Sequence, residues 1–205
     1  MPEDLSGMTV LDIGSWDGFF AFEAERRGAS RVLATDSFCW NGDGWGTKDG
    51  FNLARKVLNS KVDDLEIDVL ELSPEKVGTF DLVLCLGVLY HMRDPLLALE
   101  RIFSVTKRQL ILDTHVEHLM TNRPMIAFYP GAELNNDPTN WCGPNRAAVV
   151  AMLKAAGFRR AEMVYQRFGF NPGYRLARAI KRKLIDHESF RIALAQDRMV
   201  FHAFR

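Results

Sequence analysis

The chain has 205 residues, of which 47% are apolar and 25% charged, a composition typical of a soluble globular protein with one domain. Its 26 basic and 26 acidic residues cancel, so the net charge predicts no general attraction to nucleic acid or to a membrane. Three widely spaced cysteines, and no apolar run near the roughly 18 residues of a membrane span, predict a cytoplasmic protein with reduced thiols.

Short apolar segments that are typical of β-strands alternate with helix patterns along the chain. Strands are predicted at 9–13, 31–35, 65–69, 80–87 and 109–116, with helices near 17–28, 48–59 and 94–104. A further helix, over 144–157 with Pro144 near its first turn, precedes two strands near 159–168 and 197–205. This order predicts an α/β fold with a Rossmann-like, doubly wound sheet of seven mostly parallel strands and an antiparallel last strand.

Two segments exceed what a minimal doubly wound domain needs. Residues 117–143 leave the carboxyl end of the fifth strand, where parallel sheets bind ligands, so we expect a substrate lid there. Residues 170–197 are expected to form a helical insertion before the last strand, within a single domain that spans 1–205. The basic residues of this insertion suit either a solvated helix face or a contact with an anionic substrate or RNA.

Four features follow successive predicted strands. Gly14 and Gly18 flank the turn after the first strand, where absent side chains permit a close backbone approach to a ligand. Asp36 ends the second strand and Asp68 the third, although a carboxylate at such a place can also be a helix cap. The fourth strand leads to a glycine and a Tyr-His pair. Because the first loop contains no Lys or Arg, the set favours a nucleoside-like ligand without phosphate.

The ordered set resembles the class I S-adenosylmethionine-dependent methyltransferases over nearly the whole chain. "VLDIGSWDG" is similar to their first motif, "ATD" to the second, "DVLEL" to the third and "FDLVLCLGVLYHMRDP" to the fourth. The resemblance implies S-adenosyl-L-methionine as the cofactor, with a binding site made of Asp12, Gly14, Ser15, Trp16, Gly18, Asp36, Ser37, Asp68, Val69 and Leu86.

Trp16 departs from the first motif of this family, which has a glycine at that place. Its backbone can still trace the loop. Two places are open for its indole. It can line the methionine side of the site, or it can pack in the core under the first helix.

"GVLYHMRDPLLALERI" resembles the branch that contains the tRNA wobble-uridine carboxymethyltransferases and their relatives. Those enzymes bind a carboxylated cofactor with basic and tyrosine residues, partly from a region ahead of the first motif. Because this chain begins almost directly at the first strand, we expect a methyl donor and a small-molecule acceptor, with a hydroxyl or amine of a small metabolite or sugar as the methylated group. The alternatives are a tRNA wobble-uridine modifying enzyme, with RNA as a less favoured partner, and a non-catalytic partner subunit with the methyltransferase fold.

Histidines supply the candidate catalytic group. His91 follows the fourth strand, beside the expected methyl group, and suits a general base or a substrate contact; the alternative is a residue that packs at the next helix start. His115 and Glu117 leave the fifth strand and can also face the pocket. No metal site is predicted, because the histidines and acids lack ligand spacing.

The remaining candidates belong to the acceptor. Tyr90, His115, Asn140 and Trp141 are the expected substrate-binding residues, with Asn145 close to the last two. Trp141 and the asparagines also suit a turn followed by a helix cap, with the indole anchoring the loop.

Overall fold

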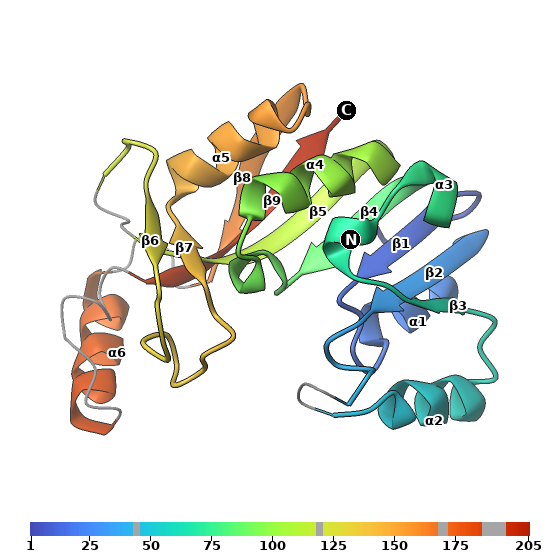
Figure 1. Cartoon of the computed structure of the whole chain (residues 1–205), viewed down its shortest axis with the longest axis horizontal. Helices are drawn as coiled ribbons and strands as arrows, with labels where there is room; N and C mark the ends of the chain where they lie inside the picture. The colour runs from blue at the N-terminus through green and yellow to red at the C-terminus, as the bar shows by residue number, and fades with distance from the viewer. Residues whose placement is uncertain (43–45, 118–120, 168–171, 186–195) are drawn as a thin grey trace.

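A seven-stranded sheet forms the centre of the computed structural model, which describes residues 1–42, 46–117, 121–167, 172–185 and 196–205 (Figure 1). The strand order is β3-β2-β1-β4-β5-β9-β8. The strands are β1 Thr9–Ile13, β2 Arg31–Asp36, β3 Asp63–Glu66, β4 Phe80–Leu86, β5 Thr106–Val116, β8 Arg160–Gln166 and β9 Asp197–Phe204. Neighbouring strands from β3 to β5 pair parallel, whereas β9 pairs antiparallel with both β5 and β8. The predicted fold class is confirmed.

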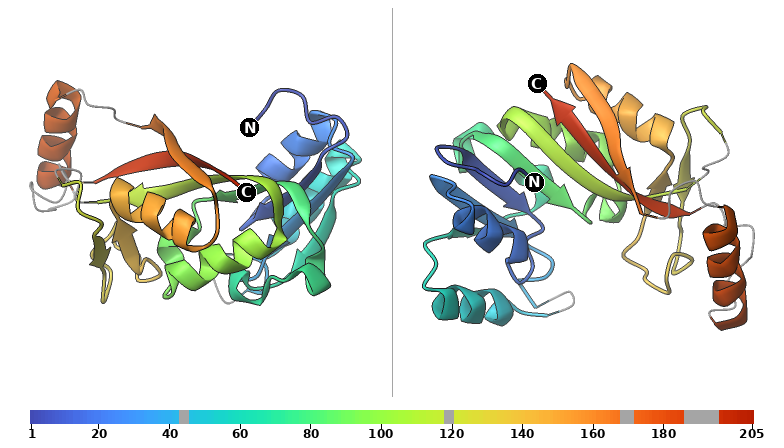
Figure 2. Two further views of the ribbon diagram at one scale, coloured as in Figure 1. Left: turned by 90° about the horizontal axis from the view of Figure 1, so that it is seen from above. Right: turned by 180° about the vertical axis from the view of Figure 1, so that it is seen from behind.

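Helices cover both faces of the sheet (Figure 2). The α-helices are α1 Phe19–Arg26, α2 Asp49–Leu58, α3 Pro74–Val77, α4 Pro95–Val105, α5 Arg146–Ala155 and α6 Pro172–Ile185, and two 3-10 helices are η1 Val69–Glu71 and η2 Leu89–His91. None of the described helices is both long enough and apolar enough to span a membrane.

Alternate residues of the central strands belong to two separate cores. In β4, Val83 and Cys85 pack with α4 and α5 on one face, and Leu82 and Leu84 pack with α1 on the other. This happens because successive side chains of a strand point to opposite faces, and helices cover both. The central strands are therefore fixed on both sides, and their carboxyl ends form a rigid edge.

Several element boundaries differ from the sequence prediction, and at two of them a side-chain hydrogen bond explains the difference. β3 ends at Glu66 rather than at 69, because the side chain of Asp68 accepts a hydrogen bond from the backbone N–H of Leu70 (2.8 Å) and starts η1. α5 begins at Arg146, because the Asn145 side chain caps it by accepting from the N–H of Ala148 at 2.8 Å. Pro144, predicted near the first turn of this helix, instead ends a short strand.

The predicted lid segment contains a small second sheet. β6 Ile126–Phe128 pairs antiparallel with β7 Cys142–Pro144, and we call residues 121–144 the β6–β7 arm. The arm lies beside the carboxyl end of β5, and α6 stands outside the main sheet (Figure 1). Residues 118–120 of the predicted lid, and residues 170, 171 and 186–195 of the predicted helical insertion, lie outside the described residues.

Candidate functional site

A cavity of about 600 Å³ lies at the carboxyl ends of β1, β2 and β4. Gly14, Trp16, Asp36, Ser37, Asp68, Val69, Leu86, Tyr90, His91 and Trp141 are the predicted site residues that line it. This edge gathers them because parallel strands bring the loops that follow them to the same end of the sheet. Asp12, Ser15, Gly18, His115 and Asn140, which were also predicted, lie outside its described lining.

The loop after β1 comes close to the loop after β4. Gly14 has a φ of 68°, and a Cβ atom there would collide with the side chain of Val88. The backbone N–H groups of Gly14 and Ser15 both donate to the carbonyl oxygen of Thr35, at 2.8 and 3.0 Å. Glycine is therefore required both by the backbone conformation and by the close approach of the two loops.

Trp16 continues this loop in a left-handed conformation, with a φ of 48°. Its N–H donates to Oδ2 of Asp36 at 3.0 Å, and its carbonyl oxygen accepts from Nε1 of Trp40 at 2.7 Å. These two bonds hold a conformation that costs an ordinary residue about 1–2 kcal/mol. The indole is 49% exposed and lines the cavity, so the alternative of core packing under α1 is wrong.

The two acidic residues of the cavity differ in what they bind. Asp36 is buried at the end of β2, and its two oxygens accept the backbone N–H groups of Trp16 and Cys39, each at 3.0 Å. The side chain of Asp68 caps η1, as the helix-cap alternative predicts. Asp68 also lines the cavity. Both residues lie next to Ile67, whose N–H donates to the carbonyl oxygen of Asp36 at 3.0 Å.

Asp12 and Ser15 form a buried hydrogen-bonded pair at the start of the loop after β1. The hydroxyl of Ser15 donates to Oδ2 of Asp12 at 2.8 Å, and both residues are buried. Burial in the low dielectric of the protein raises the pKa of Asp12 to about 7, although the Ser15 hydrogen bond opposes this. Gly18, with a φ of 86°, precedes α1 and leaves room for the rings of Phe22 and Phe51.

His91 is held in one orientation by residues from the β6–β7 arm. Its Nδ1 lies 3.0 Å from both the carbonyl oxygen and the hydroxyl of Thr139, and that hydroxyl donates to Asp137 at 2.6 Å. Since the carbonyl can only accept, Nδ1 carries the proton and Nε2 is the basic nitrogen of the neutral ring. Burial lowers the pKa of His91, so the ring is neutral at pH 7.

The arm is anchored to the sheet by buried polar contacts. The N–H of Trp141 donates to the carbonyl oxygen of Tyr90 at 2.8 Å. The hydroxyl of Tyr129 donates to Glu117 and lies 3.1 Å from Nε2 of His115, and all three residues are buried. His115 and Glu117 thus hold the arm in place through the hydroxyl of Tyr129.

Asn140 and Asn145 contact the backbone of the arm. The side-chain amide of Asn140 donates to the carbonyl oxygen of Leu134 at 2.9 Å, and that of Asn145 to Arg123 at 2.7 Å. Both side chains are buried. For Asn145 the helix-cap alternative is confirmed by its bond to α5.

Comparison with known proteins identifies the family. A family model for a methyltransferase domain matches residues 1–162.

The chain belongs to this family of methyltransferases.

A tRNA U34 carboxymethyltransferase of Pseudomonas paraeruginosa is 30% identical to this methyltransferase over 167 residues, or 78% of the chain and 48% of the relative. The chain spans about half the length of the curated relatives it matches. Among solved structures, the N-terminal domain of EvdMO1, crystallised in the presence of SAH and D-fucose, has a TM-score of 0.69 at 19% identity, over 97% of this chain and 76% of that one. An S-adenosylmethionine dependent methyltransferase from Mesorhizobium loti has a TM-score of 0.63 at 16% identity, over 100% of this chain and 94% of that one. These structures share the fold.

Sequence reasoning missed a charged pair of which one member, Arg198, lines the cavity of the methyltransferase. Arg198 of β9 lines the cavity, forms a salt bridge with Asp113 of β5, and donates to the hydroxyl of Tyr90 at 3.2 Å. The two strands pair antiparallel across this point, with His115 opposite Arg198. No local signal marks the pair, because its members are 85 positions apart. Thr139 and Asp137 were missed as well, since only the folded arm brings them to His91.

The raised pKa of Asp12 predicts a specific pH dependence of stability. Between about pH 3.8 and about pH 7 the folded protein retains a proton on Asp12 that the unfolded chain has lost. The free energy of unfolding therefore falls as the pH rises through this window. Asp12→Asn keeps an acceptor for Ser15 but removes the ionisation, so its stability should depend less steeply on pH, as measured by urea denaturation at several pH values. The exposed Asp63→Asn is the control, and a wild-type slope in Asp12→Asn would contradict the assignment.

Proposed function

We propose that this methyltransferase binds S-adenosyl-L-methionine in the 600 Å³ cavity and transfers a methyl group to a hydroxyl or amine of a small metabolite or sugar. The observation that carries the proposal is the set of residues that line the cavity. It has two parts, which are glycine and acidic residues from the loops after β1, β2 and β3, and Tyr90, His91 and Trp141 from the loop after β4 and the β6–β7 arm. The volume is within the range of about 300–1,000 Å³ that is usual for small-molecule sites.

The first part of the cavity fits a nucleoside. The absent side chain at Gly14 lets backbone form the wall, and Asp36 offers a carboxylate that is already oriented by two backbone N–H groups. Each carboxylate oxygen can accept a second hydrogen bond, which suits the hydroxyls of a ribose. Asp68 and Val69 supply an acceptor and an apolar contact beside it. The half-exposed indole of Trp16 would cover the methionine side.

Of the two arginines that line the cavity, Arg198 favours a methyl over a carboxymethyl donor because Asp113 neutralises it, whereas Arg93 forms no salt bridge within the described residues. The guanidinium of Arg198 is already neutralised by Asp113, so this pair brings no net positive charge to the cavity. A carboxylate on the cofactor would have to compete with Asp113 for the same N–H donors. The alternative, a tRNA wobble-uridine modifying enzyme, is supported by the names of the relatives at about 30% identity, and the zero net charge of the chain weighs against RNA as partner.

His91 is the proposed general base. The sulfonium cofactor supplies the methyl group when bound, so the chain itself has to align the acceptor and remove its proton. The hydrogen bond from Nδ1 to Thr139 fixes the ring, and the lowered pKa keeps it neutral and able to accept a proton at Nε2. Asp137 acts as a positioning residue through Thr139.

The β6–β7 arm is the proposed lid of the site. Pro138, Thr139 and Trp141 of the arm line the cavity, and the bond from Trp141 to Tyr90 joins the arm to the loop that carries His91. A lid in this place excludes water from the reacting groups and orients the acceptor.

Binding of S-adenosyl-L-methionine should depend on the charge of Asp36. Asp36→Asn keeps one acceptor oxygen for the loop but removes the charge, and a hydrogen bond to a charged group contributes about 1.5–3 kcal/mol. We expect about tenfold to hundredfold weaker binding by calorimetry. The exposed Asp63→Asn should bind as the wild type does, and an unchanged affinity in Asp36→Asn would rule out this site.

The choice of donor can be measured on the wild-type chain. S-adenosyl-L-methionine should bind at least about tenfold more tightly than its carboxylated derivative, a difference of about 1.4 kcal/mol, because Asp113 already occupies Arg198. Competition calorimetry with the two compounds checks this. Preferential binding of the carboxylated cofactor would replace the proposal with the carboxymethyl alternative.

Turnover should depend on His91 without a change in cofactor binding. His91→Ala removes the base and should lower methyl transfer by about 10²–10⁴-fold. Incorporation of labelled methyl into a metabolite extract, followed by mass spectrometry, measures this. His202→Gln on β9 is the control histidine variant, because His202 lies outside the described lining of the cavity. Full activity of His91→Ala would leave alignment alone as the mechanism, and no transfer by the wild type would favour a non-catalytic subunit.

A further inference from the structure

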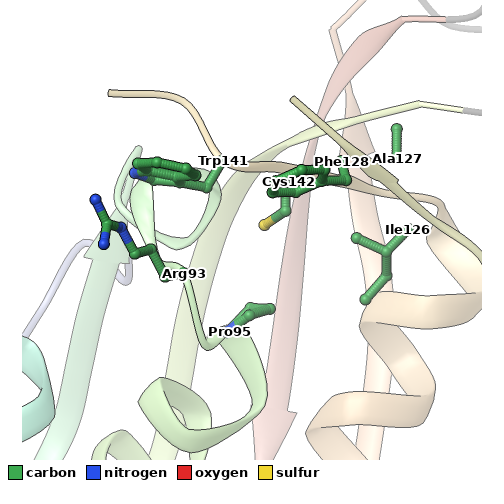
Figure 3. A pocket seen from close by; sticks show the side chains of 7 residues that line it. All are labelled: Arg93, Pro95, Ile126, Ala127, Phe128, Trp141 and Cys142. Carbon is green, nitrogen blue, oxygen red and sulfur yellow. The ribbon is translucent and has the colours of Figure 1, made fainter. Parts of the chain in front are cut away.

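A second cavity, of about 500 Å³, opens between the start of α4 and the β6–β7 arm (Figure 3). Arg93 and Trp141 line both this outer cavity and the proposed cofactor cavity. A molecule in the outer cavity would therefore lie against two side chains that also line the inner one. The Trp141 backbone is itself bonded to Tyr90, the neighbour of His91.

Two aromatic rings of the arm form one wall of the outer cavity. The rings of Phe128 and Trp141 lie within 28° of parallel, with their centroids 6.4 Å apart. Arg93 lies against the Trp141 ring, and Pro95 lines the cavity from the start of α4 (Figure 3). Phe128 is 67% exposed although it belongs to a strand, and Ile126 beside it is exposed as well. An exposed aromatic surface that lines a cavity is typical of a ligand site.

Arg93 gives this apolar cavity its charge. Its guanidinium carbon lies 4.2 Å from the centre of the Trp141 ring, and no salt bridge of Arg93 is present in the described part of the chain. A guanidinium carries five N–H donors, and contact with an aromatic ring does not use them. These donors suit a carboxylate or another acidic group.

We propose that the outer cavity binds the ring of an aromatic acid, which is the acceptor of the methyl group. The ring packs on Phe128 and Trp141, the acidic group binds Arg93, and a hydroxyl or amine on the ring reaches past Trp141 toward His91. This inference rests on the proposed function and narrows its acceptor. A sugar fits the same walls poorly, because Ile126, Phe128 and Pro95 offer no hydrogen-bond partners to its hydroxyls.

The test uses the full chain loaded with S-adenosylhomocysteine and 4-hydroxycinnamate as the probe. Calorimetry should show that the probe binds more than about fivefold more tightly than 3-(4-hydroxycyclohexyl)propenoate, which has the same polar groups and linker on a saturated ring. Phe128→Ala should weaken probe binding by about 3–10-fold, and Arg93→Gln by about tenfold. Tyr165→Ala, which removes an exposed aromatic side chain on β8, is the matched control and should bind the probe as the wild type does.

Any one of several results would overturn the inference. They are equal binding of the acid with the saturated ring, no binding of 4-hydroxycinnamate at millimolar concentration, or unchanged binding in both cavity variants. Tighter binding of uridine 5′-monophosphate than of the aromatic acid would also overturn it, and would assign the cavity to a nucleotide. Binding of S-adenosylhomocysteine is measured on the same preparations. Protein that binds it but not the aromatic acid contradicts only this inference, whereas protein that fails to bind it contradicts the proposed function.

Discussion

The carboxylate of Asp36 joins the two loops on which the site depends. One oxygen accepts the N–H of Trp16 from the loop after β1, and the other accepts the N–H of Cys39 from the loop after β2. The strands beneath these loops are fixed by cores on both faces, so the carboxylate connects two rigid supports. The loops keep their shape because an acceptor at the edge of the sheet satisfies backbone groups that neither strand can pair.

The acceptor side of the cavity depends on a different kind of support. The arm has only two three-residue strands, which is too little pairing to hold a segment of this length in place. Its position instead depends on the buried contacts of Tyr129 with Glu117 and His115, and on the bond from Trp141 to Tyr90. His115 and Glu117, which the sequence offered as residues facing the pocket, therefore act by positioning the arm whose side chains line the cavity.

Sequence reasoning predicted the parts of the site that depend only on which residues directly follow a strand. Gly14 and Asp36 could be placed because each directly follows an apolar segment, and parallel strands bring such positions to one edge. β3 was shifted by two or more residues because the Asp68 side chain competes for a backbone N–H that a strand would use. The pair of Arg198 and Asp113 was out of reach, because its partners meet only through the pairing of β5 with β9. The roles of His115 and Glu117 depend in the same way on the position of Tyr129.

The left-handed backbone of Trp16 shows how the chain balances stability against the needs of the cavity. Glycine would adopt this φ without strain, so the tryptophan makes the loop less stable than it needs to be. Hydrogen bonds from Trp40 and to Asp36 offset the strain but would be available to a glycine as well, since both involve only backbone atoms of residue 16. The indole is therefore the only feature of the loop that requires tryptophan, rather than glycine, at position 16. The loop therefore gives up folding free energy to place a single aromatic surface on the cavity wall.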